Sequence, residues 1–203
     1  MQQAINLDKN QLLWQTSENA LVEAADSISS LTNTETRIKL LSMGGTDVRQ
    51  AVSLLDTEEP EIIAVSQALG DAMQGHAVVV AKESCVMVTL RQLINEKAQL
   101  RELTELEEES LSEIGNIILN SCLGNYADLL NARISSQLPV LSRGHFTHVL
   151  QRYVDDSQAQ GLFYLLVSLN AGSASCQMCI LWNRLSWDES LQVPLGRSEL
   201  KTR

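Results

Sequence analysis

One order of secondary structure is predicted twice along this chain of 203 residues. In each half a helical pattern leads into a short extended segment, and two apolar strands joined by a glycine-containing turn follow. The copies are offset by roughly 100 residues and share pattern rather than residue identity, as expected of an internal duplication. Two such halves predict α/β units that share one sheet, with helices packed against it.

The first half is delimited by apolar periodicity and by glycine and proline. We expect a helix over 11–31, a strand over 36–41 that Gly44 and Gly45 stop, and a short amphipathic helix that ends before Pro60. The expected hairpin and the helix that follows it comprise Ile62–Leu69, His76–Ala81 and Glu83–Glu96.

The second half begins with the longest helical pattern, Leu103–Asn131. It continues with an extended segment at 133–135, an alternating strand at Phe146–Val154, a hairpin of Leu162–Leu169 and Ser175–Trp182, and a short helix at Leu185–Leu191. We therefore expect a single domain over residues 1–203, whose halves span about 11–96 and 103–195.

The charge of the chain restricts its partners. There are 15 basic and 25 acidic residues, a formal net charge of −10, which disfavours binding to nucleic acid or to an anionic membrane surface. The first residues lack the basic and apolar regions of a secretory signal, and the four cysteines are widely spread. We expect reduced thiols and a cytoplasmic protein.

The long helical pattern in the second half carries a row of polar residues. Glu109, Glu113, Asn116 and Asn120 recur at steps of three and four, so they share one face of a helix. The opposite, core-facing side is predicted to consist of Leu103, Leu106, Ile114, Ile117, Ile118, Ser121 and Cys122. Asparagine in mid-helix and Gly115 both cost helix stability, which indicates a place that another surface approaches closely. An ordinary solvent-exposed face is the alternative.

At these residues the chain resembles the CheC/CheX/FliY family of chemotaxis proteins. The resemblance consists of Glu113-x-x-Asn116, twenty-two further residues and then Pro139, together with the flanking text Ser112-Glu-Ile-Gly-Asn-Ile-Ile118. Glu109 departs from the Asp or Ser usual in the family. The matching helix of the first half has Glu23 and then Asp26 in place of asparagine, with no proline at the corresponding spacing, so that site is expected to be degenerate.

The resemblance implies a pseudo-two-fold, duplicated α+β domain with a largely antiparallel sheet and long surface helices. It also implies a phosphatase that hydrolyses the aspartyl phosphate of a CheY-type receiver. Asn116 would orient the attacking water and Glu113 would pair with a receiver lysine. The receiver would supply Mg²⁺, so this chain is expected to bind no metal or other cofactor. Further receiver contacts are expected from Glu109, Asn120, Leu119 and Leu123, although the two leucines suit the core equally well.

Two other functions stay open at this stage. The chain could be a non-catalytic adaptor, like the FliM middle domain, or a partner of the deamidase CheD. It could also bind a small molecule in a cleft between its halves. The pairs Cys176/Cys179 and His145/His148 have spacings found in zinc sites, but both fall in predicted strands, where residues three apart point to opposite faces. The oligomeric state is left undecided.

Overall fold

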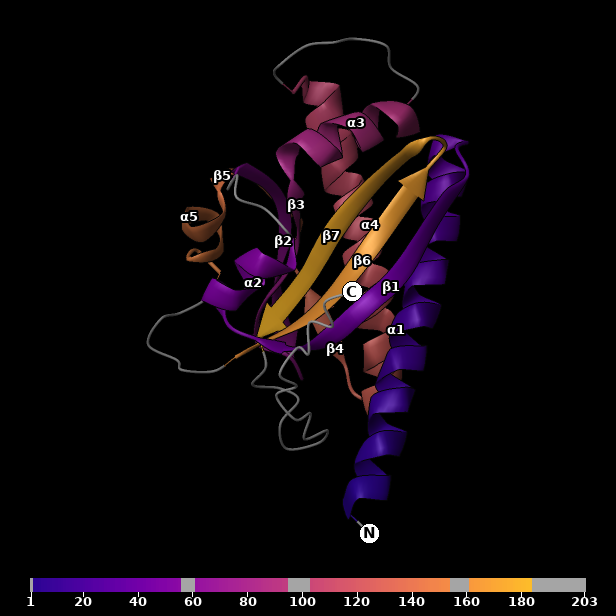
Figure 1. Ribbon diagram of the computed structural model, residues 1–203, viewed down its shortest axis with the longest axis vertical. Coiled ribbons are helices and arrows are strands. Elements are labelled where there is room, and N and C mark those ends of the chain that lie inside the picture. The colour runs from indigo at the N-terminus through magenta and orange to yellow at the C-terminus, as the bar shows by residue number, and fades with distance from the viewer. Residues whose placement is uncertain (1, 56–60, 95–102, 154–160, 184–203) are drawn as a thin grey trace, which may run out of the picture.

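A computed structural model describes residues 2–55, 61–94, 103–153 and 161–183. The helix predicted at Leu185–Leu191 lies outside these residues. Seven strands form one sheet: β1 (Thr36–Thr46), β2 (Glu61–Asp71), β3 (Gly75–Lys82), β4 (Ile134–Ser136), β5 (Val140–His145), β6 (Leu162–Ala171) and β7 (Ala174–Asn183). The strand order is β1-β6-β7-β3-β2-β4, with β5 also paired to β2 (Figure 1).

The two halves of the chain interlock within this sheet. The first-half strand β1 pairs with β6 of the second half, and the second-half strands β4 and β5 pair with β2 of the first. The hairpins β2–β3 and β6–β7 meet at the centre through β3 and β7. All of these pairings are antiparallel. The order is therefore symmetric about its centre, which agrees with the expected pseudo-two-fold α+β fold.

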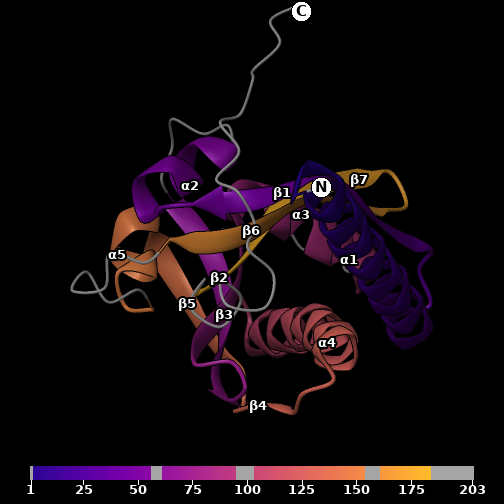
Figure 2. The ribbon, with the colours of Figure 1, turned by 90° about the horizontal axis from the view of Figure 1, so that it is seen from below.

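Helices cover both faces of the sheet. The helices are α1 (Gln2–Thr32), α2 (Val48–Leu54), α3 (Glu83–Leu93), α4 (Glu105–Leu130) and α5 (Phe146–Leu150). One core cluster lies between the sheet and α1, α3 and α4, and a second lies between the sheet and α2 and α5. Figure 2 shows α4 on one side of the sheet and α2 on the other. No helix among the described residues is long and apolar enough to cross a lipid bilayer.

The strands divide their side chains between the two clusters by simple alternation. In β6, Phe163, Leu165 and Val167 belong to the α1/α4 side, whereas Leu162 belongs to the α2/α5 side. Because both faces are covered, the strands of the two hairpins carry apolar residues on both faces, which made the hairpins predictable from the sequence.

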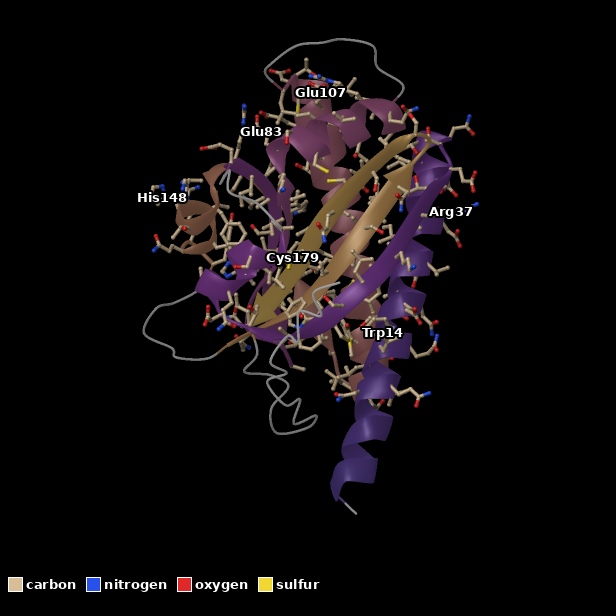
Figure 3. All side chains as sticks on the ribbon, in the orientation of Figure 1. Trp14, Arg37, Glu83, Glu107, His148 and Cys179 are labelled. Carbon is tan, nitrogen blue, oxygen red and sulfur yellow. The ribbon has the colours of Figure 1, made fainter. Side chains whose placement is uncertain are left out.

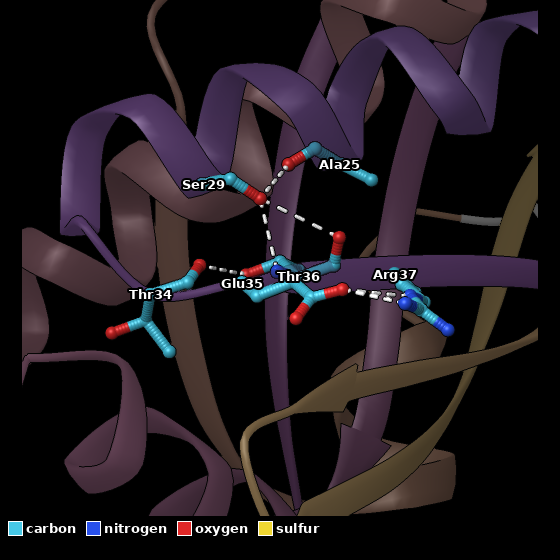
Figure 4. A network of polar contacts seen from close by, with 6 residues as sticks. All are labelled: Ala25, Ser29, Thr34, Glu35, Thr36 and Arg37. Atoms are coloured by element: carbon cyan, nitrogen blue, oxygen red, sulfur yellow. Dashed lines mark hydrogen bonds and ion pairs between the residues drawn. The ribbon is translucent and has the colours of Figure 1, made fainter.

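The turn from α1 into β1 is closed by side-chain hydrogen bonds (Figure 4). The Ser29 hydroxyl donates to the carbonyl oxygen of Ala25 at 2.7 Å and accepts the backbone N–H of Thr36 at 2.9 Å. Asn33 has a φ of 54°, a left-handed conformation that asparagine tolerates well. This turn reverses the chain, so that β1 lies beside α1.

Several predicted boundaries are wrong. The first helix begins at Gln2, nine residues before the expected residue 11. Gly44 and Gly45 do not stop β1, because they pair with Tyr164 and Phe163 of β6, and the Tyr164 ring packs over Gly44. The stretch Phe146–Val154 was predicted to be a strand, yet β5 ends at His145 and α5 begins at Phe146. The spacing of the buried residues Phe146, Val149 and Leu150 is helical, and five residues are too few to separate this pattern from alternation.

Candidate functional site

The polar row of α4, consisting of Glu109, Glu113, Asn116 and Asn120, lies at the surface as predicted. Glu109, Glu113 and Asn120 are exposed, and Asn116 is partly buried. The row therefore presents two carboxylates and then two amides along the helix. Asn116 and Asn120 also reach toward the sheet, where Gln67 of β2 donates to both.

A groove runs between the first half of α4 and the segment that joins β4 to β5. Its volume is about 410 Å³, and it is lined by Glu105, Glu108, Glu109, Ser112, Glu113, Pro139 and Leu141. The fold thus brings Glu113 and Pro139 to the same groove, although 26 positions separate them in the sequence. Four carboxylates on one wall make the groove attractive to a cation on a partner.

A buried ion pair secures the N-terminus of α4. The Thr104 side chain and Glu107 form a capping box, and Arg91 of α3 donates from Nε to Glu107 Oε1 at 3.0 Å. Burial acts to raise the pKa of Glu107, but the backbone N–H of Thr104 and the Arg91 guanidinium outweigh it, so that its pKa is lowered. Glu107, labelled in Figure 3, is ionised, and its ion pair with Arg91 joins α3 to α4.

Gly115 allows α4 to lie unusually close to the sheet. A Cβ at this position would be 2.5 Å from Cβ of Val65 in β2, far inside van der Waals contact. The surface that approaches Gly115 is therefore the protein's own strand β2. This contact sets the depth at which the next residue, Asn116, meets the sheet.

The Asn116 amide takes part in a hydrogen-bond network beneath the row. Gln67 of β2 donates from Nε2 to Asn116 Oδ1 at 2.7 Å, and Asn120 donates from Nδ2 to the same oxygen at 2.9 Å. Asn120 Oδ1 accepts longer hydrogen bonds of 3.4 Å from Gln67 and Ser136. Gln67 was not among the predicted site residues. The signal was present, since it is a polar residue inside the apolar run Ile62–Leu69.

The prediction that Leu119 and Leu123 contact a partner is wrong. They are only 1% and 6% exposed and lie in the core cluster between the helices and the sheet. The helix packs against α1 as well as against the sheet, so its buried surface is wider than the predicted stripe. Conversely, Leu106 was predicted to be buried and is 59% exposed. The large apolar side chains exposed beside Pro139 are Leu138 and Val140.

The face of α1 that corresponds to the polar row of α4 contacts α4. Glu23 and Asp26 are exposed, and Glu23 Oε2 accepts a 2.9 Å hydrogen bond from Asn125 Nδ2 of α4. A second contact between these helices joins the buried Ser17 and Tyr126 hydroxyls at 2.5 Å. The first-half glutamate is therefore engaged in helix pairing.

The two candidate zinc pairs differ in geometry. Cys176 and Cys179 lie in β7 and belong to opposite core clusters, as the strand pattern predicted. Burial also raises the pKa of the Cys179 thiol, which disfavours the thiolate that metals bind. His145 and His148 lie at the β5–α5 junction instead of within one strand, and their ring centroids are 5.3 Å apart. Within the described residues, no three His, Cys, Asp or Glu side chains gather as a metal site would require.

The space beneath α3 is too small for a typical ligand. An apolar cavity of about 40 Å³ lies between α3, α4 and the sheet and is lined by Val86, Thr89, Leu90, Leu93, Leu111, Ile114, Leu169, Cys176 and Met178. Ligand pockets are commonly ~300–1,000 Å³. This cavity therefore gives no support to a small-molecule site.

Comparison with solved structures identifies the fold. The chain matches no known family profile and no curated protein sequence. FliY from Thermotoga maritima superposes with a TM-score of 0.70 at 16% sequence identity, covering 87% of this chain and 90% of FliY. The FliM middle domain from H. pylori superposes with a TM-score of 0.62 at 12% sequence identity, covering 91% of this chain and 97% of the FliM chain.

A third match includes a bound receiver. CheX in the CheX–CheY–BeF₃–Mg²⁺ complex from Borrelia burgdorferi gives a TM-score of 0.50 at 14% identity, covering 81% of this chain and 96% of that one. This chain has the fold of the CheC/CheX/FliY proteins. The resemblance inferred from Glu113, Asn116 and Pro139 is confirmed at the level of the fold. A CheC-like fold is shared by FliY, FliM and CheX, so function must be argued from the site.

Proposed function

We propose that this protein hydrolyses the aspartyl phosphate of a CheY-type receiver and so ends a chemotaxis-type signal. The observation that carries the proposal is the position of Asn116, which is partly exposed one turn from Glu113, with the groove that Pro139 lines beside it. The CheX complex with CheY provides a precedent for this fold beside a receiver. Such a partner implies a cytoplasmic location.

The reaction needs little from the protein besides placement. Water attacks phosphorus and forms a new P–O bond while the bond to the aspartate oxygen breaks. The electron pair stays on the carboxylate, and the water proton leaves with phosphate or solvent. Because the transition state is loose, positioning the water and phosphoryl group supplies most of the catalysis. An amide at 116 does this without adding negative charge, which is why Asp26 would be a poor substitute.

The remaining row and its surroundings would dock the receiver. Glu113 would pair with the receiver's active-site lysine, and the receiver would bring Mg²⁺ with its phospho-aspartate. Glu109 and Asn120 would extend the polar contact along the helix. We assign the apolar contact to Leu138 and Val140, which are 85% and 56% exposed, in place of the buried Leu119 and Leu123.

The proposal is tested by following phosphate release from phosphorylated receivers. Wild-type protein is added to cognate receiver domains in the presence of Mg²⁺, beside Asn116→Ala and the matched control Asn125→Ala. Asn125 lies on the same helix but bonds to Glu23 of α1, away from the groove. Wild type and the control are expected to accelerate dephosphorylation. Asn116→Ala should reduce the acceleration about 10²-fold, because the water loses its placement.

A second candidate function is that of a non-catalytic adaptor in a flagellar switch or a partner of CheD. It is favoured by the match to FliM in the FliG–FliM complex from H. pylori, with a TM-score of 0.66 at 13% identity. An adaptor would bind a receiver or CheD without changing the rate of phosphate loss. If no cognate receiver is dephosphorylated faster in the presence of wild type, the phosphatase proposal is lost and the adaptor is favoured.

A further inference from the structure

Gln67 occupies a position where the fold calls for an apolar residue. Along β2 its side chain lies on the same face as Ile63, Val65 and Leu69, which point toward α4 and the larger core cluster. It is 2% exposed, and its Oε1 atom has no hydrogen-bond partner among the described residues. A buried polar atom without a hydrogen-bond partner lowers the stability of the folded protein. Core packing therefore does not explain a glutamine here.

Gln67 and Asn120 together use both acceptor positions of the Asn116 oxygen. A carbonyl oxygen has two lone pairs, and Asn116 Oδ1 accepts one bond of 2.7 Å from Gln67 and one of 2.9 Å from Asn120. Among the described residues, no hydrogen bond engages Asn116 Nδ2. The amide is planar, so holding Oδ1 against the buried Gln67 directs Nδ2 away from the strand.

We propose that Gln67 is a positioning residue that fixes the Asn116 amide with its N–H donors toward the incoming phosphoryl group. This inference rests on the proposed phosphatase function. It changes the role of Asn116: the side chain acts as a donor to an oxygen of the attacking water or phosphoryl group, since its own oxygen is occupied. A glutamine that places its Nε2 donor beneath Asn116 also buries its Oε1 atom without a partner in the described part of the chain, which lowers the stability of the fold.

The inference predicts that stability and activity respond in opposite ways to one substitution. Gln67→Met keeps the length of the side chain but removes its donors and the unpaired Oε1 atom. We expect a melting temperature equal to or above that of wild type, because a lost hydrogen bond is offset by the removal of a buried unpaired acceptor. We expect unchanged receiver affinity and about a 10²-fold lower rate at saturating receiver, because Asn116 is released from its orientation.

A double-mutant cycle tests whether Gln67 acts through Asn116. In an Asn116→Ala background, Gln67→Met should cause no further loss of rate, since the group it positions is gone. Leu69→Ala serves as the matched control, because it perturbs the same face of β2 without touching Asn116. It should lower the melting temperature and leave the rate of the folded protein unchanged.

A measurement that needs no receiver separates this inference from the proposed function. In nuclear magnetic resonance spectra, the two Asn116 side-chain NH₂ protons of wild type should have shifts displaced from random-coil values, and Gln67→Met should bring both toward those values. Retention of the wild-type shifts, or of the wild-type rate, in Gln67→Met would overturn the inference. If wild type dephosphorylates no receiver but the shifts change as expected, the orientation stands and the phosphatase function fails.

Discussion

At the scale of single residues, Gly115 shows how one missing side chain positions the site. Helix propensity alone favours alanine over glycine by about 1 kcal/mol. The packing reverses this preference, because Cβ of Val65 lies 2.5 Å from where a Cβ of residue 115 would be. The close approach of α4 to β2 is also what allows Gln67 to reach Asn116.

We predict that Gly115→Ala destabilises the protein by about 1–3 kcal/mol, because overpacking forces helix and strand apart. Urea unfolding measures the change in stability. The rate of receiver dephosphorylation should also fall in this variant. Gly124→Ala is the matched control on the same helix, since a Cβ there meets nothing within 4 Å. The free energy of unfolding of Gly124→Ala should be higher than that of wild type by up to about 1 kcal/mol. An equal increase in stability in Gly115→Ala and Gly124→Ala would show that helix and strand accommodate the contact with Val65 at no cost.

At the scale of elements, α4 is held at its N-terminus by the Glu107 network. The carboxylate accepts from the backbone N–H of Thr104 at 2.8 Å and from Arg91 at 3.0 Å while being 1% exposed. Its pKa is lowered in the folded state, so its contribution to stability is present above the ordinary glutamate pKa. The contribution is lost as the pH falls through the lowered value.

Glu107→Gln should therefore destabilise the protein most at neutral pH, by about 1–3 kcal/mol. The difference from wild type should shrink as the pH falls below 4.5, the ordinary glutamate value, because Glu107 of the unfolded wild-type chain takes up a proton there while the folded carboxylate, with its lowered pKa, does not. Thermal unfolding between pH 3 and pH 7 measures this dependence. Glu108→Gln, at the exposed neighbouring position, should have little effect at any pH. A Glu107→Gln penalty that does not vary with pH would refute an ionised Glu107.

At the scale of the whole molecule, the duplicated halves cannot form separate sheets. Strand β1 of the first half pairs with β6 of the second, and β5 of the second half pairs with β2 of the first. The two hairpins join through β3 and β7. The helices α1 and α4, one from each half, also pack side by side. Neither half buries its own apolar faces without the other.

We predict a single cooperative unfolding transition. Far-ultraviolet circular dichroism and tryptophan fluorescence should give coincident urea curves, since loss of either half removes the partner strands of the other. Val167→Ala in β6, at a fully buried site paired with Leu40, should shift both curves together. Two separate midpoints would mean that the halves fold independently.

The periodic sequence determined the duplication, the two apolar hairpins and the polar row, because those patterns depend on neighbours within one element. It also placed Glu113, Asn116 and Pro139 in a family context. Tertiary structure alone decided that Leu119 and Leu123 are buried, that β1 continues past its glycines, and that Gln67 lies beneath Asn116. These outcomes depend on which surfaces meet across the fold. Gln67 lies 49 positions before Asn116, so the hydrophobic periodicity of α4 gives no sign of the contact between them.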